Sequence, residues 1–184
     1  MLYVKMPKER VGVLIGEDGK VKHQIESLCK VRLEVDSGNG DVTVIPTDEG
    51  AKDGLVGLNA RDIVKAMACG FSPDRAMRLA GEDMYLEVFD IRDFAGKDRK
   101  HVSRVKARII GTNGKTRTTI EDFSGAEISI YGNTIAIIGD MLSMDAARGA
   151  VEMLLEGSEH SAVYRFLEGK RRYMKFREMS MEAP

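Results

Sequence analysis

The spacing of hydrophobic residues divides the first half of the chain into short strands and helices. Apolar residues three and four positions apart predict a helix over 8–15. Alternation of apolar and polar residues over 31–35 predicts a half-buried strand. Ser72 and Pro73 fit the N-cap and the first position of a helix. The other elements expected in this half are strands over 2–5 and 42–45 and helices over 20–29, 51–69 and 73–80.

The second half repeats this order of elements. The elements expected there are a strand over 84–91, helices over 99–110 and 115–123, strands over 126–130 and 134–138, and helices over 141–155 and from about 161 to 177. Residues 180–184 are expected to fray. Each half therefore predicts a two-layer α+β unit, in which three helices pack on one face of a three-stranded sheet. We place the boundary at Gly81, which gives domains over 1–80 and 81–184.

A short phrase occurs once in each half. Ile15-Gly-Glu-Asp-Gly-Lys20 matches Ile110-Gly-Thr-Asn-Gly-Lys115, and an Ile-Glu pair follows each copy at the same distance. Gly16 and Gly111 are 95 positions apart, as are Ile25 and Ile120. A matched apolar frame around two fixed glycines indicates two copies of one small domain.

Composition limits the class of protein. The chain has 184 residues, of which 43% are hydrophobic and 31% charged, as in soluble globular proteins. No apolar run approaches the roughly 18 residues of a membrane span, and the first residues lack a signal-peptide core, so we expect a cytoplasmic location. Two cysteines without a CxxC pair and three scattered histidines support no metal site and no cofactor.

Charge is separated along the second half, although the net charge is only −1. Residues 97–117 hold eight Lys or Arg and one acid, Asp98, whereas residues 118–159 hold eight acids and one base, Arg148. A basic stripe of this kind either neutralises phosphates or forms a solvated helix face. The run Lys170–Arg177, with five bases and two aromatic residues, leaves the same two interpretations open.

The Gly-x-x-Gly loop between two helices has a chemical use. Its glycines let the backbone turn tightly and let a ligand approach, and the helix that follows points free N–H groups at the gap. Phosphate groups bind well at such helix N-termini. One copy alone would more often be a plain turn, but two copies in matching frames favour a binding function.

The two segments Val13–Ile25 and Arg108–Ile120 resemble the signature of KH domains of type I. In that family the loop clamps about four nucleotides of single-stranded backbone. The resemblance extends over nearly the whole chain, and the tandem layout is similar to that of archaeal KH proteins of ribosomal-RNA processing. These are the counterpart of the eukaryotic small-subunit assembly factor that partners the Nob endonuclease.

The resemblance implies non-catalytic binding of single-stranded RNA, near the 3′ end of small-subunit rRNA during ribosome maturation. An rRNA endonuclease or another assembly factor is the further partner that it implies. The candidate RNA-binding residues are Gly16, Gly19, Lys20, Lys22, Arg104, Arg108, Gly111, Thr112, Asn113, Gly114, Lys115 and Arg117. Bases would lie between the loop helices and the edge strand. Five isoleucines are either the floor of that groove or ordinary core, namely Ile109, Ile110, Ile120, Ile128 and Ile130.

The first copy departs from the family pattern. Its loop carries Glu17 and Asp18, and each carboxylate would repel a phosphate by about 1 kcal/mol at close range in water. Thr112 and Asn113 carry no such penalty. We therefore expect the second copy to dominate RNA affinity, and the first to bind weakly or to contact a partner protein.

Other functions are less well supported. Gly114-Lys115-Thr116 matches the end of a Walker A loop, but the glycine required five residues before Gly114 is replaced by Ile109. No nucleophile–base pair or metal cluster stands out, so we do not expect an enzyme. A protein-interaction scaffold remains an alternative, as does a KH protein of RNA decay or translation.

Overall fold

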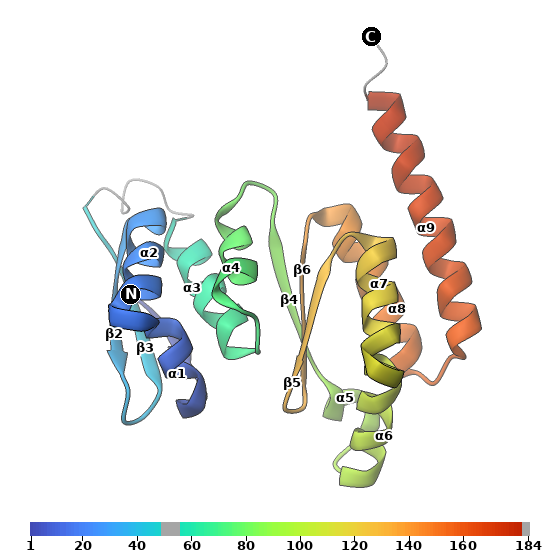
Figure 1. Ribbon diagram of the computed structural model, residues 1–184, viewed down its shortest axis with the longest axis horizontal. Helices are drawn as coiled ribbons and strands as arrows, with labels where there is room; N and C mark the ends of the chain where they lie inside the picture. Colours follow the sequence, from blue (N-terminus) through green and yellow to red (C-terminus); the bar gives the residue numbers. More distant parts are fainter. Residues whose placement is uncertain (49–55, 182–184) are drawn as a thin grey trace. The chain divides into compact units, whose positions relative to one another are not determined.

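A computed structural model describes residues 1–48 and 56–181 of the chain (Figure 1). The chain divides into two compact units, Met1–Leu86 and Glu87–Pro184. Each unit contains a three-stranded antiparallel sheet and several helices, so the predicted α+β class is confirmed. The boundary between KH domains at Gly81 stays a prediction.

The first unit pairs its strands in the order β1-β3-β2. Val31 and Leu33 of β2 are buried while Arg32 and Glu34 are exposed, so one face of the strand joins the core, as the alternating pattern predicts. The elements are β1 (Leu2–Lys5), α1 (Lys8–Ile15), α2 (Lys20–Cys29), β2 (Val31–Asp36), β3 (Asp41–Pro46), α3 (Val56–Ala68) and α4 (Pro73–Ala76), followed by a 3-10 turn over Met77–Ala80.

The second unit repeats this sheet, in the order β4-β6-β5. Ile128 of β5 lies opposite Ile137 of β6, and both side chains join the core. The elements are β4 (Tyr85–Asp90), α5 (Ile91–Ala95), α6 (Arg99–Ile110), α7 (Lys115–Ser124), β5 (Glu127–Tyr131), β6 (Thr134–Gly139), α8 (Met141–Leu155) and α9 (His160–Met181).

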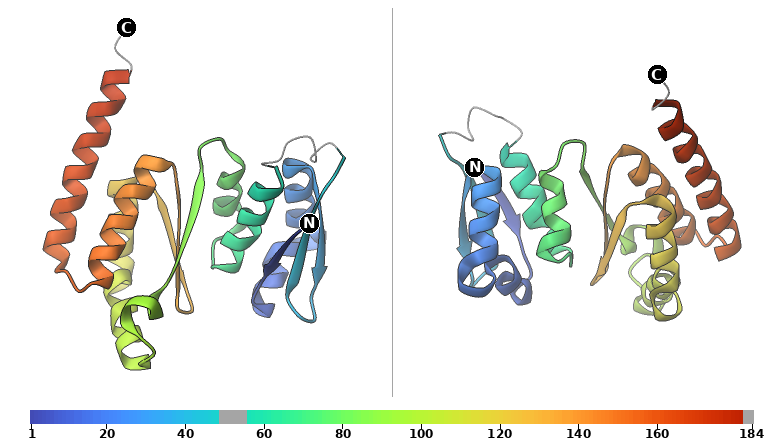
Figure 2. Two further views of the ribbon diagram at one scale, coloured as in Figure 1. Left: turned by 180° about the vertical axis from the view of Figure 1, so that it is seen from behind. Right: turned by 45° about the horizontal axis from the view of Figure 1, so that its top comes forward.

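Helix α9 packs against α7 and α8 through its first half, where Val163 and Leu167 are fully buried. Its last turns project beyond the rest of the second unit in each view (Figures 1 and 2). The side chains of Tyr173 and Phe176 are exposed there.

The structure differs from the sequence-based expectation at three places. The strand expected over 84–91 ends at Asp90, whose carboxylate accepts a hydrogen bond from Arg92 N and caps the unexpected helix α5. The count of three helices per sheet is not confirmed, because the described residues of the second unit form the unexpected helix α5 in addition to the expected C-terminal helix α9. Ser180 and Met181 belong to α9 rather than to a frayed end. Part of the helix expected over 51–69 and residues 182–184 lie outside the described residues.

Candidate functional site

The two Gly-x-x-Gly loops have nearly the same backbone conformation. Gly16 has φ 73° and ψ 179°, and Gly111 has φ 74° and ψ 173°. The third loop residue is left-handed in both copies, with φ 52° at Asp18 and at Asn113. Asp and Asn are the residue types that tolerate this conformation best after glycine. The repeated phrase in the sequence therefore encodes a repeated turn.

The two glycines of each loop are needed for different reasons. A Cβ at Gly111 would lie 2.3 Å from Thr116 Oγ1 and 2.6 Å from Thr116 N, and a Cβ at Gly16 would lie 2.5 Å from Val21 Cγ2. At Gly114 no described atom lies within 4 Å of the added Cβ, so only its φ of 77° favours glycine. The first glycine lets the loop pack closely against the following helix, because it has no Cβ. The second adopts the left-handed conformation that directly precedes that helix.

The turn aims the N-terminus of a helix at solvent. Helix α7 begins at Lys115 directly after Gly114, and no side chain caps it. The N–H of Lys115 donates to Thr112 O, the other N–H groups of the first turn have no side-chain cap, and the helix dipole favours negative charge there. Helix α2 begins in the same way after Gly19.

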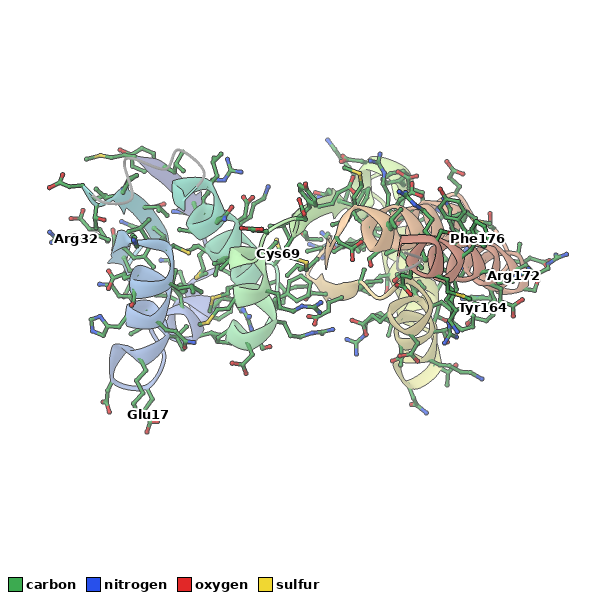
Figure 3. All side chains as sticks on the ribbon, turned by 90° about the horizontal axis from the view of Figure 1, so that it is seen from above. Glu17, Arg32, Cys69, Tyr164, Arg172 and Phe176 are labelled. Atoms are coloured by element: carbon green, nitrogen blue, oxygen red, sulfur yellow. The ribbon has the colours of Figure 1, made fainter. Side chains whose placement is uncertain are left out.

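The loops differ in charge. In the first copy Glu17 and Asp18 are both exposed, and Glu17 Oε2 lies 3.6 Å from Lys20 Nζ (Figure 3). In the second copy the exposed pair is Thr112 and Asn113. No carboxylate in residues 1–48 or 56–181 forms an ion pair with Lys115. The second loop thus offers a cation and neutral donors where the first offers two carboxylates.

Two predicted binding residues are each paired with a partly buried glutamate. Lys22 Nζ lies 3.8 Å from Glu26 Oε1, and Arg117 Nε lies 3.7 Å from Glu121 Oε2. Arg117 Nε is buried without a hydrogen-bond partner among the described residues, while 41% of the Arg117 side chain is exposed. Arg117 can therefore still present part of its guanidinium group to a ligand.

A depression of about 490 Å³ lies on the α9 side of the second loop. Arg104 on its wall is exposed, but the guanidinium of Arg108 donates hydrogen bonds to the carbonyls of Gly157 and Ser158. Arg108 therefore fixes the connection between α8 and α9 as well as contributing positive charge. The wall is formed by Arg104, Ala107, Arg108, Gly111, Thr112, Lys115, Thr116, His160 and Tyr164.

A second depression, of about 310 Å³, lies between α6 and the β5–β6 turn. Lys106 crosses it and donates a hydrogen bond to Gly132 O at 2.8 Å. Arg92 is held by Asp90, and this hydrogen bond keeps the pKa of the Asp90 carboxyl below its usual range. The basic residues on its wall are Arg92, Lys97, Arg99 and Lys106.

The five isoleucines divide between core and surface. Ile109, Ile120 and Ile128 are fully buried, so they belong to the core and cannot touch a ligand. Ile110 and Ile130 are partly exposed, and only these two remain candidates for a groove floor.

Several residues of these depressions were not singled out from the sequence. His160 and Tyr164 reach the loop from α9, and His160 Nε2 lies 2.9 Å from Arg108 O. Their spacing of four residues places them on one helix face, but no local signal shows which helix that face meets. The described residues contain no group of three or more His, Cys, Asp or Glu side chains suited to a metal ion. None of their helices is long and apolar enough to cross a membrane.

A known family model matches much of the second half of the chain. Residues 85–172 match the model of the second KH domain of PNO1, described as a eukaryotic-type KH domain (KH-domain type I). The matched segment contains the Gly111–Gly114 loop and most of α9.

Known proteins are similar over most of the chain. A KH domain-containing protein of Methanocaldococcus jannaschii is 47% identical over 172 residues, which cover 94% of this chain and 74% of that protein. The pre-rRNA-processing protein pno1 of Aspergillus fumigatus is 30% identical over 88% of this chain, which spans only 64% of that longer relative.

A solved structure has the same fold. A chain in the crystal structure of an a/eIF2alpha–aDim2p–rRNA complex from Pyrococcus horikoshii is 44% identical, with a TM-score of 0.86 and 93% of each chain covered.

Proposed function

Because the chain belongs to the PNO1-type KH-domain family, we propose that it binds single-stranded RNA and catalyses no reaction on it. The observation that carries the proposal is the second loop, where Gly111 and Gly114 aim the N-terminus of α7 at solvent beside Lys115. Exposed Thr112 and Asn113 add neutral hydrogen-bond donors. These groups suit a phosphate backbone, which a KH loop grips over about four nucleotides.

The target that we propose is small-subunit rRNA near its 3′ end, during ribosome maturation. Relatives are named for pre-rRNA processing, and a similar chain occurs in a structure of a complex that contains rRNA. An rRNA endonuclease or another assembly factor is the protein partner of this proposal, and a cytoplasmic location is part of it. The bases would lie toward β5, where Ile110 and Ile130 are partly exposed. Lys106 borders the depression between α6 and the β5–β6 turn on that side.

The second copy dominates binding in this proposal. The residues that would contact RNA there are Arg104, Arg108, Gly111, Thr112, Asn113, Gly114, Lys115 and Arg117. The matching positions of the first copy, Gly16, Gly19, Lys20 and Lys22, contribute less, because Glu17 pairs with Lys20 and repels phosphates. The acidic loop of the first unit favours a second function for that unit, namely contact with a basic surface of a partner protein.

The test is titration of an oligonucleotide of about four nucleotides from the 3′ end of small-subunit rRNA, at fixed salt. Thr112→Asp/Asn113→Asp adds two charges worth about 1 kcal/mol each, so we expect affinity to fall about thirtyfold. Thr112→Ser/Asn113→Ser is the matched neutral control and should retain binding. Equal affinity of the acidic variant and the parent protein would show that this loop does not hold the RNA.

A further inference from the structure

The surface along which α7 and α9 meet carries a depression at each end, and we refer to this strip of surface as the furrow. At the far end of α7 lies another depression of about 350 Å³, lined by Phe123, Glu168, Arg171, Arg172 and Lys175. Tyr164 borders the loop end of the furrow and Arg172 the far end, and both are labelled on α9 in Figure 3. The two depressions lie along the same pair of helices.

One face of α9 lines this furrow. Tyr164, Glu168, Arg171 and Lys175 follow one another at intervals of four, three and four residues, which is the spacing of one helix face. That face meets α7, because Tyr164 Oη lies 3.4 Å from Thr116 Oγ1 and the Arg171 guanidinium lies over the Phe123 ring at 5.1 Å from its centre. From His160 to Lys175 the helix rises about 22 Å.

Helix α9 is held firmly as far as Lys170. Val163 and Leu167 are fully buried, and Lys170 forms an ion pair with Asp145 of α8 on another face of the helix. The α9 backbone is therefore fixed relative to the loop as far as Lys170, and the exposed side chains of Arg171, Arg172 and Lys175 follow on the next turns.

The chemistry of the furrow suits a flexible polyanion with planar groups. Arg104, Arg108 and Lys115 lie at the loop end, and Arg171, Arg172 and Lys175 lie at the far end. Among the residues that the structure describes, Glu168 is the one carboxylate that lines either depression. Cations supply phosphate contacts, and the partly exposed Tyr164 ring can contact a base, whereas Arg171 already lies over the Phe123 ring.

We propose that the furrow between α7 and α9 binds the nucleotides that flank those held by the Gly111–Gly114 loop. This proposal rests on the proposed function of the loop and extends the site away from the β5 side. At the ~3.4 Å between phosphates of a stacked strand, 22 Å admits no more than about six further phosphates. The described residues of the first unit form no counterpart of this furrow. There the short helix α4 follows α3, whereas in the second unit the long helix α9 follows α8.

The test compares a single-stranded RNA of about four nucleotides with one of about ten that contains it, which spans the loop and the furrow. Arg171→Gln/Lys175→Gln removes two phosphate contacts, each worth about fivefold in affinity at 0.1 M salt for a single strand. We expect the long RNA to bind the variant about 25-fold more weakly, with the salt slope reduced by about 1.4, and the short RNA to bind unchanged.

Arg32→Gln/Lys65→Gln, which removes two exposed charges from the first unit, is the matched control and should affect neither RNA. Equal affinity of the parent protein for the long and short RNA would overturn the furrow proposal and leave the loop intact. An equal loss of affinity for both RNAs in Arg171→Gln/Lys175→Gln would also overturn the furrow proposal. The same holds if a polyglutamate peptide binds the parent protein as tightly as the long RNA does. Failure of both RNAs to bind the parent protein would overturn the proposed function and the furrow with it.

Discussion

Glu121 Oε1 accepts a hydrogen bond from the backbone N–H of Ile128 at 2.8 Å, and Glu26 Oε1 makes the same bond with Leu33 in the first unit. Both bonds join the helix after the Gly-x-x-Gly loop to the strand that follows it. The glutamates are the second members of the repeated Ile-Glu pairs, and only 16% and 19% of their side chains are exposed. The repeat therefore preserves a bond that sets the position of the loop relative to the sheet.

Replacing Glu121 should weaken the second unit. Glu121→Ala leaves the half-buried N–H of Ile128 without its acceptor, which costs about 1–3 kcal/mol. Amide hydrogen exchange at Ile128 and the thermal midpoint of the second unit measure the effect. Asp122→Ala, at the exposed neighbouring position, is the control and should change neither. A thermal midpoint of Glu121→Ala equal to that of the control would contradict this role.

Substitution of the two loop glycines should have unequal costs. Gly114→Ala forces alanine into a left-handed conformation, for about 1–2 kcal/mol. Gly111→Ala adds a clash with Thr116 N, a backbone atom that cannot move aside, so it should lower the thermal midpoint more. Calorimetry on both variants checks the order, and the prediction is wrong if Gly114→Ala is the more damaging change.

Reversing the charge of the first loop should create a second RNA site. Glu17→Lys/Asp18→Lys removes two repulsive carboxylates and releases Lys20 from its ion pair with Glu17. At about 1 kcal/mol for each carboxylate removed, RNA affinity should rise about thirtyfold or more. The titration is repeated with the second loop disabled by Thr112→Asp/Asn113→Asp, so that only the first copy is measured. Unaltered affinity would place the first loop away from RNA.

The packing of α9 should depend on Gly149 of α8. A Cβ at this position would lie 2.6 Å from Phe166 Cζ, so Gly149→Ala should displace the Phe166 ring at a cost of about 1–3 kcal/mol, offset by up to about 1 kcal/mol of helix preference for alanine. Gly169→Ala is the matched control, because an added Cβ there meets nothing within 4 Å and alanine favours helix by up to about 1 kcal/mol. Thermal unfolding of the two variants should shift in opposite directions.

Acid should weaken the cap that Asp90 provides at the start of α5. The hydrogen bond from Arg92 lowers the pKa of Asp90 below its unfolded value of 3.8, so the folded state favours the ionised form. The stabilisation is present above that unfolded value and is lost as pH falls through the lower folded pKa. An NMR titration of the Asp90 carboxyl should give a pKa below 3.8 in the parent protein and a higher one in Arg92→Ala. A pKa that does not rise in Arg92→Ala would exclude this cause.

Local patterns predicted most of the fold because the relevant forces act over a few residues. The apolar spacing over 8–15 and the alternation over 31–35 correspond to α1 and β2. Helix α5 escaped prediction because its five residues are too few for a periodic pattern, and its start depends on the Asp90 cap.

The isoleucines show where a local pattern stops being informative. Ile109, Ile110, Ile120, Ile128 and Ile130 are alike in type. Only the packing of α6 and α7 on the sheet separates the three that are buried from the two that reach the surface.

The sequence alone determined the duplication, the two glycine turns and their difference in charge, because φ restrictions and side-chain charges are properties of single residues. Tertiary structure decided what surrounds the second loop. Arg108 bonds to the α8–α9 connection, and α9 brings His160 and Tyr164 to the loop from more than 40 residues along the chain. Such contacts depend on burial of Val163 and Leu167 against α7 and α8, and a nonlocal hydrophobic contact leaves no mark on the spacing of neighbouring residues.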